Sequence, residues 1–285
     1  MSESDRQKGV RVSESDHSRV RVPHEPRRFQ STVAYYQRYR LAYPDRLIAR
    51  VARLAGLKPG DPILDLGTGT GMLAVGFARL GMAVTAMDPE PGMLAVCEDA
   101  ARAAGVTVNL QQASSYDLTA DMGPFRLVTM GRSFHWMDRA ATLRMLDRIV
   151  TRDGGVALFH DAHPPVAEND WFKVMCDVQD RYGRKREPHI KARRGGHSRY
   201  EPFLLASAFT QLDGLSVTIR QTLTADDLVG RAFSMSACSR ETLGESTEQF
   251  AGALSAALRE LSPNGTFVEV AELVALLARR AGQDA

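Results

Sequence analysis

Residues 63–74 (Ile-Leu-Asp-Leu-Gly-Thr-Gly-Thr-Gly-Met-Leu-Ala) constrain the fold of this chain more than any other stretch. An apolar run that carries one acid, Asp65, is followed by three glycines at alternate positions and then by residues that favour a helix. Glycine has no Cβ, so the chain can turn tightly there and bring its backbone close to a ligand. The pattern predicts a buried parallel strand, a tight turn and a helix whose N-terminus faces a ligand.

A second apolar segment, residues 82–88, ends in Asp88, and an acid at the end of a second strand can accept hydrogen bonds from both hydroxyls of a ribose. The spacing of the glycines indicates the kind of nucleoside. A dinucleotide site of the form G-x-G-x-x-G requires glycine at the position of Met72, whereas the third glycine here is Gly71. The sequence therefore favours a nucleoside-containing cofactor that is not a nicotinamide or flavin dinucleotide.

The pattern Asp-x-Gly-x-Gly-x-Gly, followed by the later acid, resembles motif I of the class I S-adenosylmethionine (SAM)-dependent methyltransferases. This resemblance implies an α/β fold: a Rossmann-like, seven-stranded, mostly parallel sheet with helices on both faces. It implies SAM as the cofactor and S-adenosylhomocysteine (SAH) as the product. In that family Asp65 helps to place the amino-acid part of SAM and Asp88 holds the ribose. The loop that passes beneath the cofactor consists here of Gly67, Thr68, Gly69 and Gly71.

Further segments resemble small-molecule methyltransferases related to those of ubiquinone biosynthesis and to trans-aconitate methyltransferases. These segments are residues 35–44, rich in Tyr and Arg, residues 87–94, residues 112–115 and residues 131–138, which contain His-Trp-x-Asp. Residues 112–115 depart from the family's usual Asp-Ala or Ser-Ala. The cofactor contacts implied here are Tyr35, Arg40, Pro89, Met93, Ala113, Ser114, Ser115 and Gly131, and the substrate contacts are Tyr36, Arg132, Trp136 and His163.

Each of these side chains also has a purely structural interpretation. Met93 and Trp136 are large enough to be ordinary core residues, and the tyrosines of residues 35–43 could form a helix face that packs on the sheet. The sequence leaves both alternatives open.

Alternating strands and helices predict a parallel, doubly wound sheet. Helical residues 29–57 are divided at Tyr43-Pro44, and a helix begins after Asp138, a good N-cap. A turn at 152–155 precedes the fifth strand, and two final strands pair antiparallel. The expected strands are 62–66, 82–87, 106–112, 125–130, 155–160, 215–222 and 266–277, with late helices at 225–232 and 246–261.

The domain expected from these elements spans residues 29–285 and follows a disordered, polar tail at 1–28. Regularity is lost at about 164–213, which we expect to be an insertion that forms a lid over the substrate. Its basic stretch, residues 181–199, is either a solvated loop or a surface that closes on an anionic substrate such as a carboxylate or phosphate. An RNA substrate is a third alternative.

Catalysis by methyl transfer needs alignment of donor and acceptor, and with some acceptors a base that removes a proton. His135 and His160 are the candidates, because they follow strands four and five and imidazole titrates near neutral pH. The group His160, Asp161 and His163 could suggest a metal site, but histidines are poor magnesium ligands, so no metal is expected.

Bulk properties narrow the class of protein. The formal net charge of the 285 residues is +2, which gives no reason to expect a nucleic-acid or membrane partner. No apolar run approaches the ~20 residues that cross a bilayer, and no signal peptide is evident, so we expect a cytoplasmic protein with three isolated, reduced cysteines. The expected activity is methylation of a small molecule in specialised metabolism. The alternatives are RNA or protein methylation, SAM binding without methyl transfer, and a nicotinamide oxidoreductase; a homodimer is left open.

Overall fold

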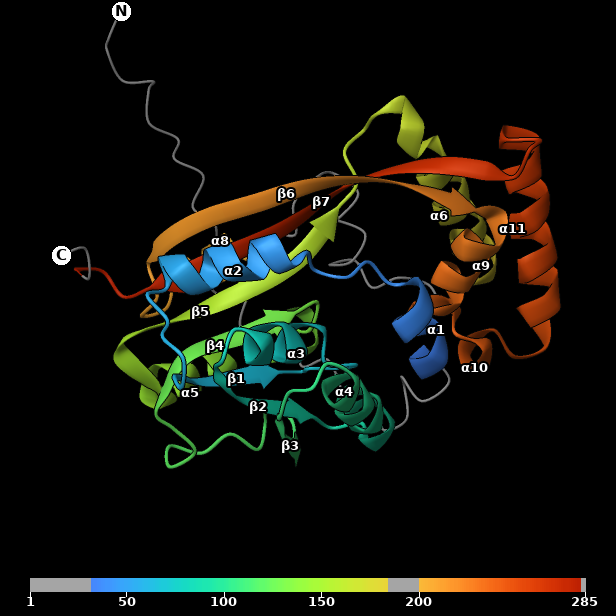
Figure 1. The fold of residues 1–285 in the computed structure, drawn as a ribbon. Coiled ribbons are helices and arrows are strands. Elements are labelled where there is room, and N and C mark those ends of the chain that lie inside the picture. Colours follow the sequence, from blue (N-terminus) through green and yellow to red (C-terminus); the bar gives the residue numbers. More distant parts are fainter. Residues whose placement is uncertain (1–31, 184–199, 283–285) are drawn as a thin grey trace, which may run out of the picture.

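A seven-stranded sheet of order β3-β2-β1-β4-β5-β7-β6 organises the computed structural model, which describes residues 32–183 and 200–282 (Figure 1). Strands β1 to β5 are parallel, and β7 runs antiparallel to both of its neighbours. This confirms the mostly parallel sheet and its antiparallel end. The strands are β1 Pro62–Leu66, β2 Ala83–Asp88, β3 Asn109–Gln112, β4 Phe125–Gly131, β5 Val150–Ala162, β6 Gln211–Thr224 and β7 Thr266–Arg279.

Helices cover both faces of this sheet. On one face, helices α2 to α4 bury side chains such as Val51, Phe77 and Cys97 in a first core. On the other face, α5 and α8 bury side chains such as Leu146 and Leu204 in a second core. The helices of the first half are α1 Val33–Tyr39, α2 Asp45–Leu54, α3 Met72–Arg79, α4 Pro91–Ala103 and α5 Arg139–Ile149, with the 3-10 turn η2 Phe134–Trp136.

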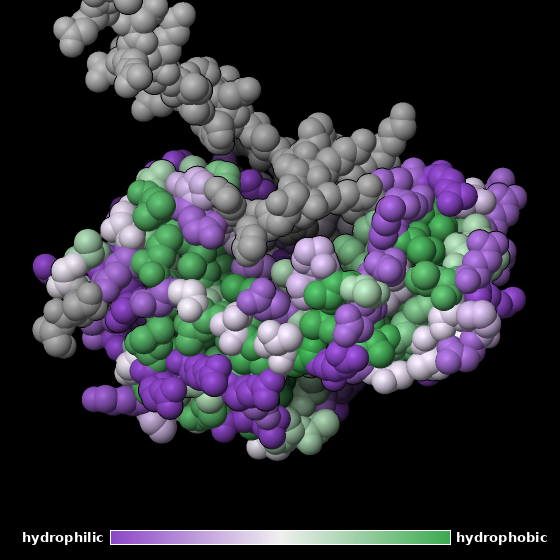
Figure 2. All heavy atoms as spheres, turned by 90° about the horizontal axis from the view of Figure 1, so that it is seen from above, coloured by the Kyte–Doolittle hydropathy of each residue, from purple (hydrophilic) through white to green (hydrophobic). Residues whose placement is uncertain are grey.

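A third core lies beyond the sheet's parallel part, where β6 and β7 extend into a helical lobe (Figure 1). Trp171, Phe250 and Phe267 are buried there. On the face seen in Figure 2, hydrophobic and hydrophilic residues are interspersed over both parts of the molecule. The remaining helices are α6 Asp170–Tyr182, α8 Glu201–Leu205, α9 Ala225–Phe233, α10 Arg240–Leu243 and α11 Thr247–Leu261, with the short turns η3 Ala167–Asn169, η5 Ser236–Cys238 and η6 Gly244–Ser246.

Local sequence signals explain several element boundaries. Pro44 separates α1 from α2, as predicted. The Asp138 side chain accepts a hydrogen bond from the Ala141 N–H and begins α5, which confirms the predicted N-cap. Thr224 and Asp227 form a reciprocal capping box at the start of α9.

The turn predicted at 152–155 is wrong, because these residues belong to β5. Phe125 pairs with Val150 but Leu127 pairs with Gly155, so the extra residues form a bulge instead of a turn. Gly154 permits this, since a Cβ there would lie 2.6 Å from the Arg126 carbonyl oxygen. The third strand is also shorter than predicted and begins at Asn109.

Two expected segments fall wholly or mostly outside the described residues. The tail at 1–28 lies before residue 32, and the basic stretch at 181–199 is described only for residues 181–183. The remainder of the expected insertion at 164–213 contains α6, which contributes to the third core, and α8, which packs on the sheet. Its role as a lid stays a prediction. None of the helices in the described ranges has the length and apolar character that a membrane crossing requires.

Candidate cofactor-binding and active site

The loop between β1 and α3 is built on three glycines with positive φ. Gly67, Gly69 and Gly71 have φ of 72°, 55° and 83°. A Cβ on Gly67 would lie 2.5 Å from the Cβ of Ser133, and one on Gly71 would lie 2.5 Å from the Sγ of Cys97. Nothing lies within 4 Å of the Cβ position of Gly69. Gly67 and Gly71 thus permit close packing of the loop, while Gly69 borders open space.

Asp88 lies at the end of β2, beside this loop. Its Oδ2 accepts a hydrogen bond from the Gly69 N–H at 2.8 Å, and its Oδ1 accepts one from the Glu90 N–H at 3.0 Å. The carboxylate of Asp88 is therefore fixed against the backbone of the glycine loop, at the carboxyl end of β2 where ligands of such sheets bind. The predicted pairing of the glycine loop with the acid of the second strand is present.

Asp65 is 1% exposed and lies beneath the loop. Its two oxygens accept hydrogen bonds from the hydroxyls of Thr68 at 2.6 Å and Thr129 at 2.7 Å. Burial raises the pKa of Asp65 to about 6, although the two hydroxyls lower it in part. The carboxyl is therefore held in a fixed orientation and titrates close to neutrality.

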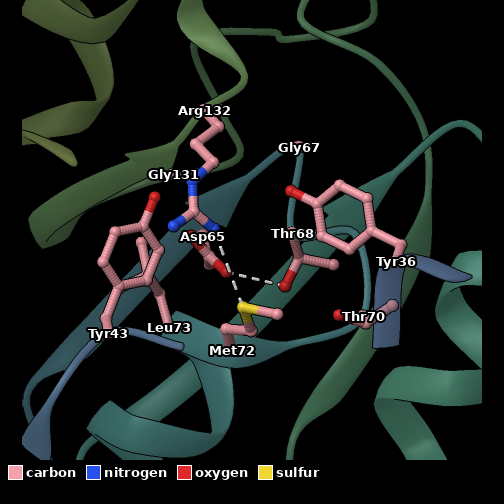
Figure 3. A pocket seen from close by; sticks show the side chains of 10 residues that line it. All are labelled: Tyr36, Tyr43, Asp65, Gly67, Thr68, Thr70, Met72, Leu73, Gly131 and Arg132. Carbon is pink, nitrogen blue, oxygen red and sulfur yellow. Dashed lines mark hydrogen bonds between the residues drawn. The ribbon is translucent and has the colours of Figure 1, made fainter. Parts of the chain in front are cut away.

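A pocket opens between the glycine loop and the N-terminal segment (Figure 3). In that view the rings of Tyr36 and Tyr43 stand on either side of Asp65. Gly131 lets Leu73 and Tyr43 approach the wall closely, since a Cβ there would lie 2.9 Å from the Cδ1 of Leu73 and 3.2 Å from the Tyr43 ring. The lining residues are Tyr36, Tyr43, Asp65, Gly67, Thr68, Thr70, Met72, Leu73, Gly131 and Arg132.

Arg132 lines the pocket from the end of β4 in a left-handed conformation with φ of 56°. Its guanidinium forms an ion pair with Asp161 and donates from Nη2 to the Leu41 carbonyl at 2.8 Å. It also stacks 4.5 Å from the centre of the Tyr43 ring. Burial opposes both charges, yet each partner stabilises the other, so the pKa of Arg132 is raised and that of Asp161 is lowered. The predicted substrate contact of Arg132 stays a prediction, with its guanidinium already engaged by Asp161.

Arg40 lies next to the same wall, with its guanidinium 5.1 Å from the centre of the Tyr36 ring. Its Nη2 donates to the Ser234 carbonyl at 3.2 Å, while its buried Nε has no hydrogen-bond partner. Within residues 32–183 and 200–282 Arg40 forms no ion pair. Burial lowers the pKa of Arg40, and the nearby charge of Asp161, which is ion-paired with Arg132, offsets this only in part.

Tyr35, predicted to contact the cofactor, faces the helical lobe. Its hydroxyl accepts a hydrogen bond from the Arg240 Nε at 2.9 Å, and its ring lies 5.4 Å from that of Phe233. The neighbouring Tyr36, predicted to contact substrate, is the tyrosine of α1 that lines the pocket. Helix α1 therefore presents Tyr36 to the pocket, whereas Tyr35 and Tyr39 stack on each other on the side of the helical lobe.

The predicted adenine contacts lie around the ends of β2 and β3. Met93 is buried in α4, the Pro89 carbonyl accepts from the Gln112 side chain at 3.4 Å, and Ala113 packs on the second core. Ser114 donates from both its N–H and its hydroxyl to Asp117, at 2.7 and 2.6 Å, and Ser115 follows in the same turn. Their contacts with a nucleoside stay predictions.

The two candidate bases lie at the carboxyl ends of adjacent strands. His135 is buried in η2, with its ring 4.6 Å from that of Trp136. His160, in β5, lies edge-on to Tyr200 at 6.0 Å. No group of three or more His, Cys, Asp and Glu side chains that could hold a metal ion occurs among the described residues.

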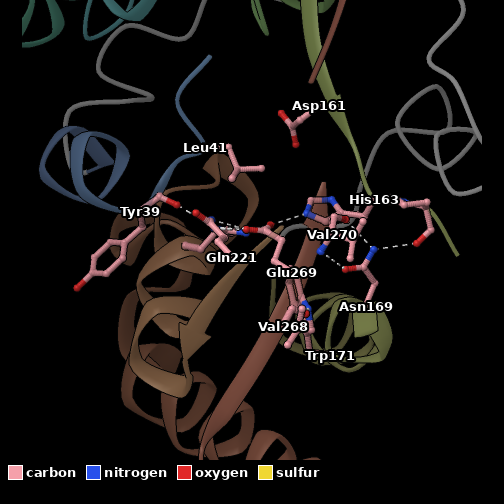
Figure 4. Close-up of polar contacts among 12 residues, drawn as sticks. Tyr39, Leu41, Asp161, His163, Asn169, Trp171, Gln221, Val268, Glu269 and Val270 are labelled. Carbon is pink, nitrogen blue, oxygen red and sulfur yellow. Dashed lines mark hydrogen bonds and ion pairs between the residues drawn. The ribbon is translucent and has the colours of Figure 1, made fainter. Parts of the chain in front are cut away.

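His163, predicted to bind substrate, belongs instead to a buried polar cluster around Glu269 (Figure 4). Its Nε2 lies 2.7 Å from the Glu269 Oε1, and its ring stacks on Phe172 at 4.6 Å. Glu269 is 0% exposed and also accepts from Arg231 and from the Gln221 amide. The carboxylate explains the position of the His163 ring, so a substrate contact is not needed to account for it.

The sequence analysis missed several residues of the site. Thr70, Met72 and Leu73 line the pocket, and they adjoin the glycines that the motif did identify. The sequence gives no indication that Thr129 or Glu269 belongs to a site. Thr129 lies in the apolar strand β4, and Glu269 lies in β7, where buried and partly exposed residues alternate. Only the three-dimensional pairing of distant strands brings them to Asp65 and Arg231.

Comparisons with known proteins agree with this geometry. The model of a methyltransferase domain family matches residues 63–155. An uncharacterized methyltransferase of Mycobacterium tuberculosis is 27% identical over 155 residues, which are 54% of this chain and 60% of that protein. A ubiquinone biosynthesis O-methyltransferase of Methylocella silvestris is 34% identical over 127 residues, 41% of this chain and 49% of that protein. The chain thus spans about half to three fifths of the length of these relatives.

Among solved structures, a SAM-dependent methyltransferase from Thiobacillus denitrificans in complex with SAH aligns with a TM-score of 0.52 and 17% identity. The alignment covers 90% of this chain and 99% of that one. At this identity the likeness shows the fold, which is the one that the glycine motif predicted.

Proposed function

We propose that the protein transfers a methyl group from SAM to a small-molecule acceptor, because residues 63–155 match the model of a methyltransferase domain family and the sheet has the fold of the class I methyltransferases. The observation that carries this proposal is the pocket lined by the glycine loop and Asp65, together with the hydrogen bond that Asp88 accepts from the Gly69 N–H of the same loop.

Four residues of the site fit SAM. Gly69 leaves open space above the loop backbone. Asp88, hydrogen-bonded to the Gly69 N–H, stands at the end of β2 where an acid can accept hydrogen bonds from ribose hydroxyls. Arg40, which has no acid partner within the described ranges, supplies the positive charge that the carboxylate of an amino acid requires. Asp65 supplies the opposite charge for its ammonium group.

When bound, SAM supplies an activated methyl sulfonium, so the protein has to align the acceptor with it and exclude water. The rings of Tyr36 and Tyr43 cover the pocket on the side of the N-terminal segment. Asp65, fixed by Thr68 and Thr129, orients the amino-acid part, and Asp88 fixes the ribose. The position of the methyl donor is thereby set through both the amino-acid part and the ribose of the cofactor.

A proton-bearing acceptor would also need a base, and we assign this role first to His135 and second to His160. Both follow the carboxyl ends of the central parallel strands, where ligands of such sheets bind. Either imidazole can accept a proton near neutral pH or orient the acceptor by a hydrogen bond.

The acceptor is a small molecule under this proposal, in line with the name of the ubiquinone biosynthesis O-methyltransferase relative. We place the reaction in specialised metabolism and in the cytoplasm. An anionic acceptor is the form that the basic stretch at 181–199 suggests. RNA or protein methylation, and SAM binding without transfer, are the alternatives that the experiment has to separate.

Calorimetric titration with SAM and SAH tests the cofactor, and Asp88→Ala is the matched variant expected to weaken binding of both. Transfer of a tritiated methyl group from SAM, assayed against metabolite, RNA and protein fractions, tests the acceptor. We expect label in the metabolite fraction alone. Absence of binding by either ligand, or stabilisation by NAD in place of SAH, would end the proposal; binding without transfer to any fraction would favour the non-methylating alternative.

A further inference from the structure

The two peptide carbonyls that flank Arg40 are each held by a different ion-paired arginine. The Tyr39 carbonyl accepts a hydrogen bond from the Arg231 Nε at 3.1 Å, and the Leu41 carbonyl accepts one from the Arg132 Nη2 at 2.8 Å. Arg231 is paired with Glu269 and Arg132 with Asp161. The backbone on both sides of Arg40 is therefore fixed by side chains from distant parts of the sequence.

Arg231, which donates to the Tyr39 carbonyl, lies on α9 of the helical lobe, and further contacts within that lobe hold it in place. Gly230, the preceding residue of α9, touches the Tyr39 ring so closely that a Cβ would lie 2.4 Å from it. Glu269 holds Arg231 through both guanidinium Nη atoms, with Nη2 at 3.1 Å from Oε2. His163 and Gln221 occupy the remaining acceptor positions of Glu269, so the carboxylate has one orientation (Figure 4).

Glu269 interrupts an apolar face of β7. Phe267 on one side belongs to the third core, and Ala271 on the other belongs to the first core. A fully buried acid at such a position costs free energy compared with an apolar residue, so it is weak as a stabilising device. Its geometric effect, which is to hold Arg231 against the N-terminal segment, is specific.

We propose that Glu269 is a positioning residue for cofactor binding, which acts through Arg231 and the Tyr39 carbonyl to set the place of the Arg40 guanidinium. The inference rests on the proposed function, in which Arg40 binds the carboxylate of the cofactor's amino-acid part. Its consequence is that the helical lobe, which lies outside the glycine motif, contributes to the affinity for that one end of the cofactor. The adenosine end is bound by other residues and does not depend on Glu269.

Two ligands separate positioning from general damage to the fold. SAH carries the amino-acid group, whereas 5′-methylthioadenosine has the same nucleoside and thioether sulfur without it. For Glu269→Gln we expect the Kd for SAH to rise by about tenfold, the scale on which supporting contacts act, and the Kd for 5′-methylthioadenosine to change by less than about twofold. The matched control is Glu168→Gln, which breaks an exposed ion pair with Arg220 and should change neither Kd.

Glu269→Gln leaves the charge of Arg231 buried without a partner and can prevent folding. The double variant Arg231→Gln/Glu269→Gln removes both charges together and should show the same selective loss. When Arg40→Ala is already present, adding Glu269→Gln or the double change should raise the Kd for SAH little further, because the side chain that Glu269 positions is absent.

Parallel loss of both ligands in the variants, or full additivity with Arg40→Ala, would overturn this inference and leave the proposed function intact. Failure of the wild-type protein to bind SAH would overturn the proposed function itself, and this inference with it. The two failures are distinguished by the wild-type titration alone.

Discussion

Arg132 and Asp161 form a largely buried ion pair between the carboxyl ends of β4 and β5, directly behind the pocket wall. The pair also reaches the N-terminal segment, because Arg132 donates to the Leu41 carbonyl and stacks on Tyr43. The Arg132 guanidinium thus connects the carboxyl ends of the central strands β4 and β5 to the N-terminal segment that covers the pocket.

Replacement of Arg132 should therefore be costly. Arg132→Gln leaves the Asp161 carboxylate without its cation, and breaking a buried pair in this way typically lowers the free energy of unfolding by about 3–5 kcal/mol. Urea denaturation measures the loss. Arg220→Gln, which breaks the exposed pair with Glu168, is the control and should lose less than about 1 kcal/mol. Equal losses in the two variants would contradict the assignment.

The raised pKa of Asp65 predicts a stability that falls as pH rises. Burial raises this pKa from 3.8 to about 6 in the folded protein. Between about pH 4 and pH 6 the folded state therefore keeps a proton that the unfolded chain has released, and the free energy of unfolding should decline across this range, by ~3 kcal/mol at most. Asp65→Asn should remove this part of the pH dependence. The prediction would be refuted if the free energy of unfolding, plotted against pH from 4 to 7, had the same slope for the wild type and for Asp65→Asn.

The same carboxyl predicts a pH dependence of binding with the opposite direction. If Asp65 holds the ammonium group of SAH, only its ionised form binds well, so affinity should weaken as the pH falls below about 6. Titration calorimetry between pH 5 and 8 follows the change. Asp65→Asn should bind weakly with no comparable pH dependence, and an affinity of the wild type that is constant over this range would exclude the contact.

The glycine loop offers a matched pair of substitutions. Gly71→Ala places a Cβ 2.5 Å from the Cys97 Sγ at a φ of 83°, so strain and overlap together should lower the free energy of unfolding by about 2–4 kcal/mol. At Gly69 the φ is 55° and no atom lies within 4 Å of the Cβ position, so Gly69→Ala should lower the free energy of unfolding through backbone strain alone, by about 1 kcal/mol. Thermal or chemical unfolding compares the two. A larger loss for Gly69→Ala would show that the loop packs differently.

The two histidines can be tested once an acceptor is known. His135→Ala should lower kcat by about 10²-fold or more if its imidazole removes the proton, with a smaller effect for His160→Ala. SAH affinity, measured in parallel, should stay within about twofold of wild type because neither residue is assigned to the cofactor. Near-full kcat in both variants would mean that alignment alone accounts for catalysis.

The sequence predicted most of the fold because its signals are local and repeated. The glycines of residues 67–71, the acid at Asp88 and the N-cap at Asp138 each specify a boundary through their own backbone chemistry. The bulge at 151–154 was mistaken for a turn, since an Asp-Gly-Gly sequence suits both and only pairing with β4 distinguishes them.

The site was predictable only where it is made of contiguous residues. Asp65 and Gly67 come from one motif, whereas the Glu269 cluster joins residues from β5, β6, β7 and α9. The sequence of β7 does not explain why an acid stands at one of its buried positions, because the partners of that acid lie on other elements. Tyr35 and Tyr36 show the same limit: the resemblance implies a ligand contact for both, but these adjacent positions of one helix have different neighbours, and Tyr35 contacts Arg240 while Tyr36 lines the pocket.

The paired strands β6 and β7 enter two hydrophobic cores in succession, with the inward side chains of β7 alternating from Phe267 to Leu277. Because this alternation has a period of two, adding or deleting one residue within β7 would turn every later side chain to the opposite face. Phe267 and Leu277 could then not both remain inside. Insertions or deletions in the connection between Thr224 and Thr266, which joins the two strands, would by contrast leave the β6–β7 register unchanged, so this connection can vary in length without disturbing the strands that link the lobe to the pocket.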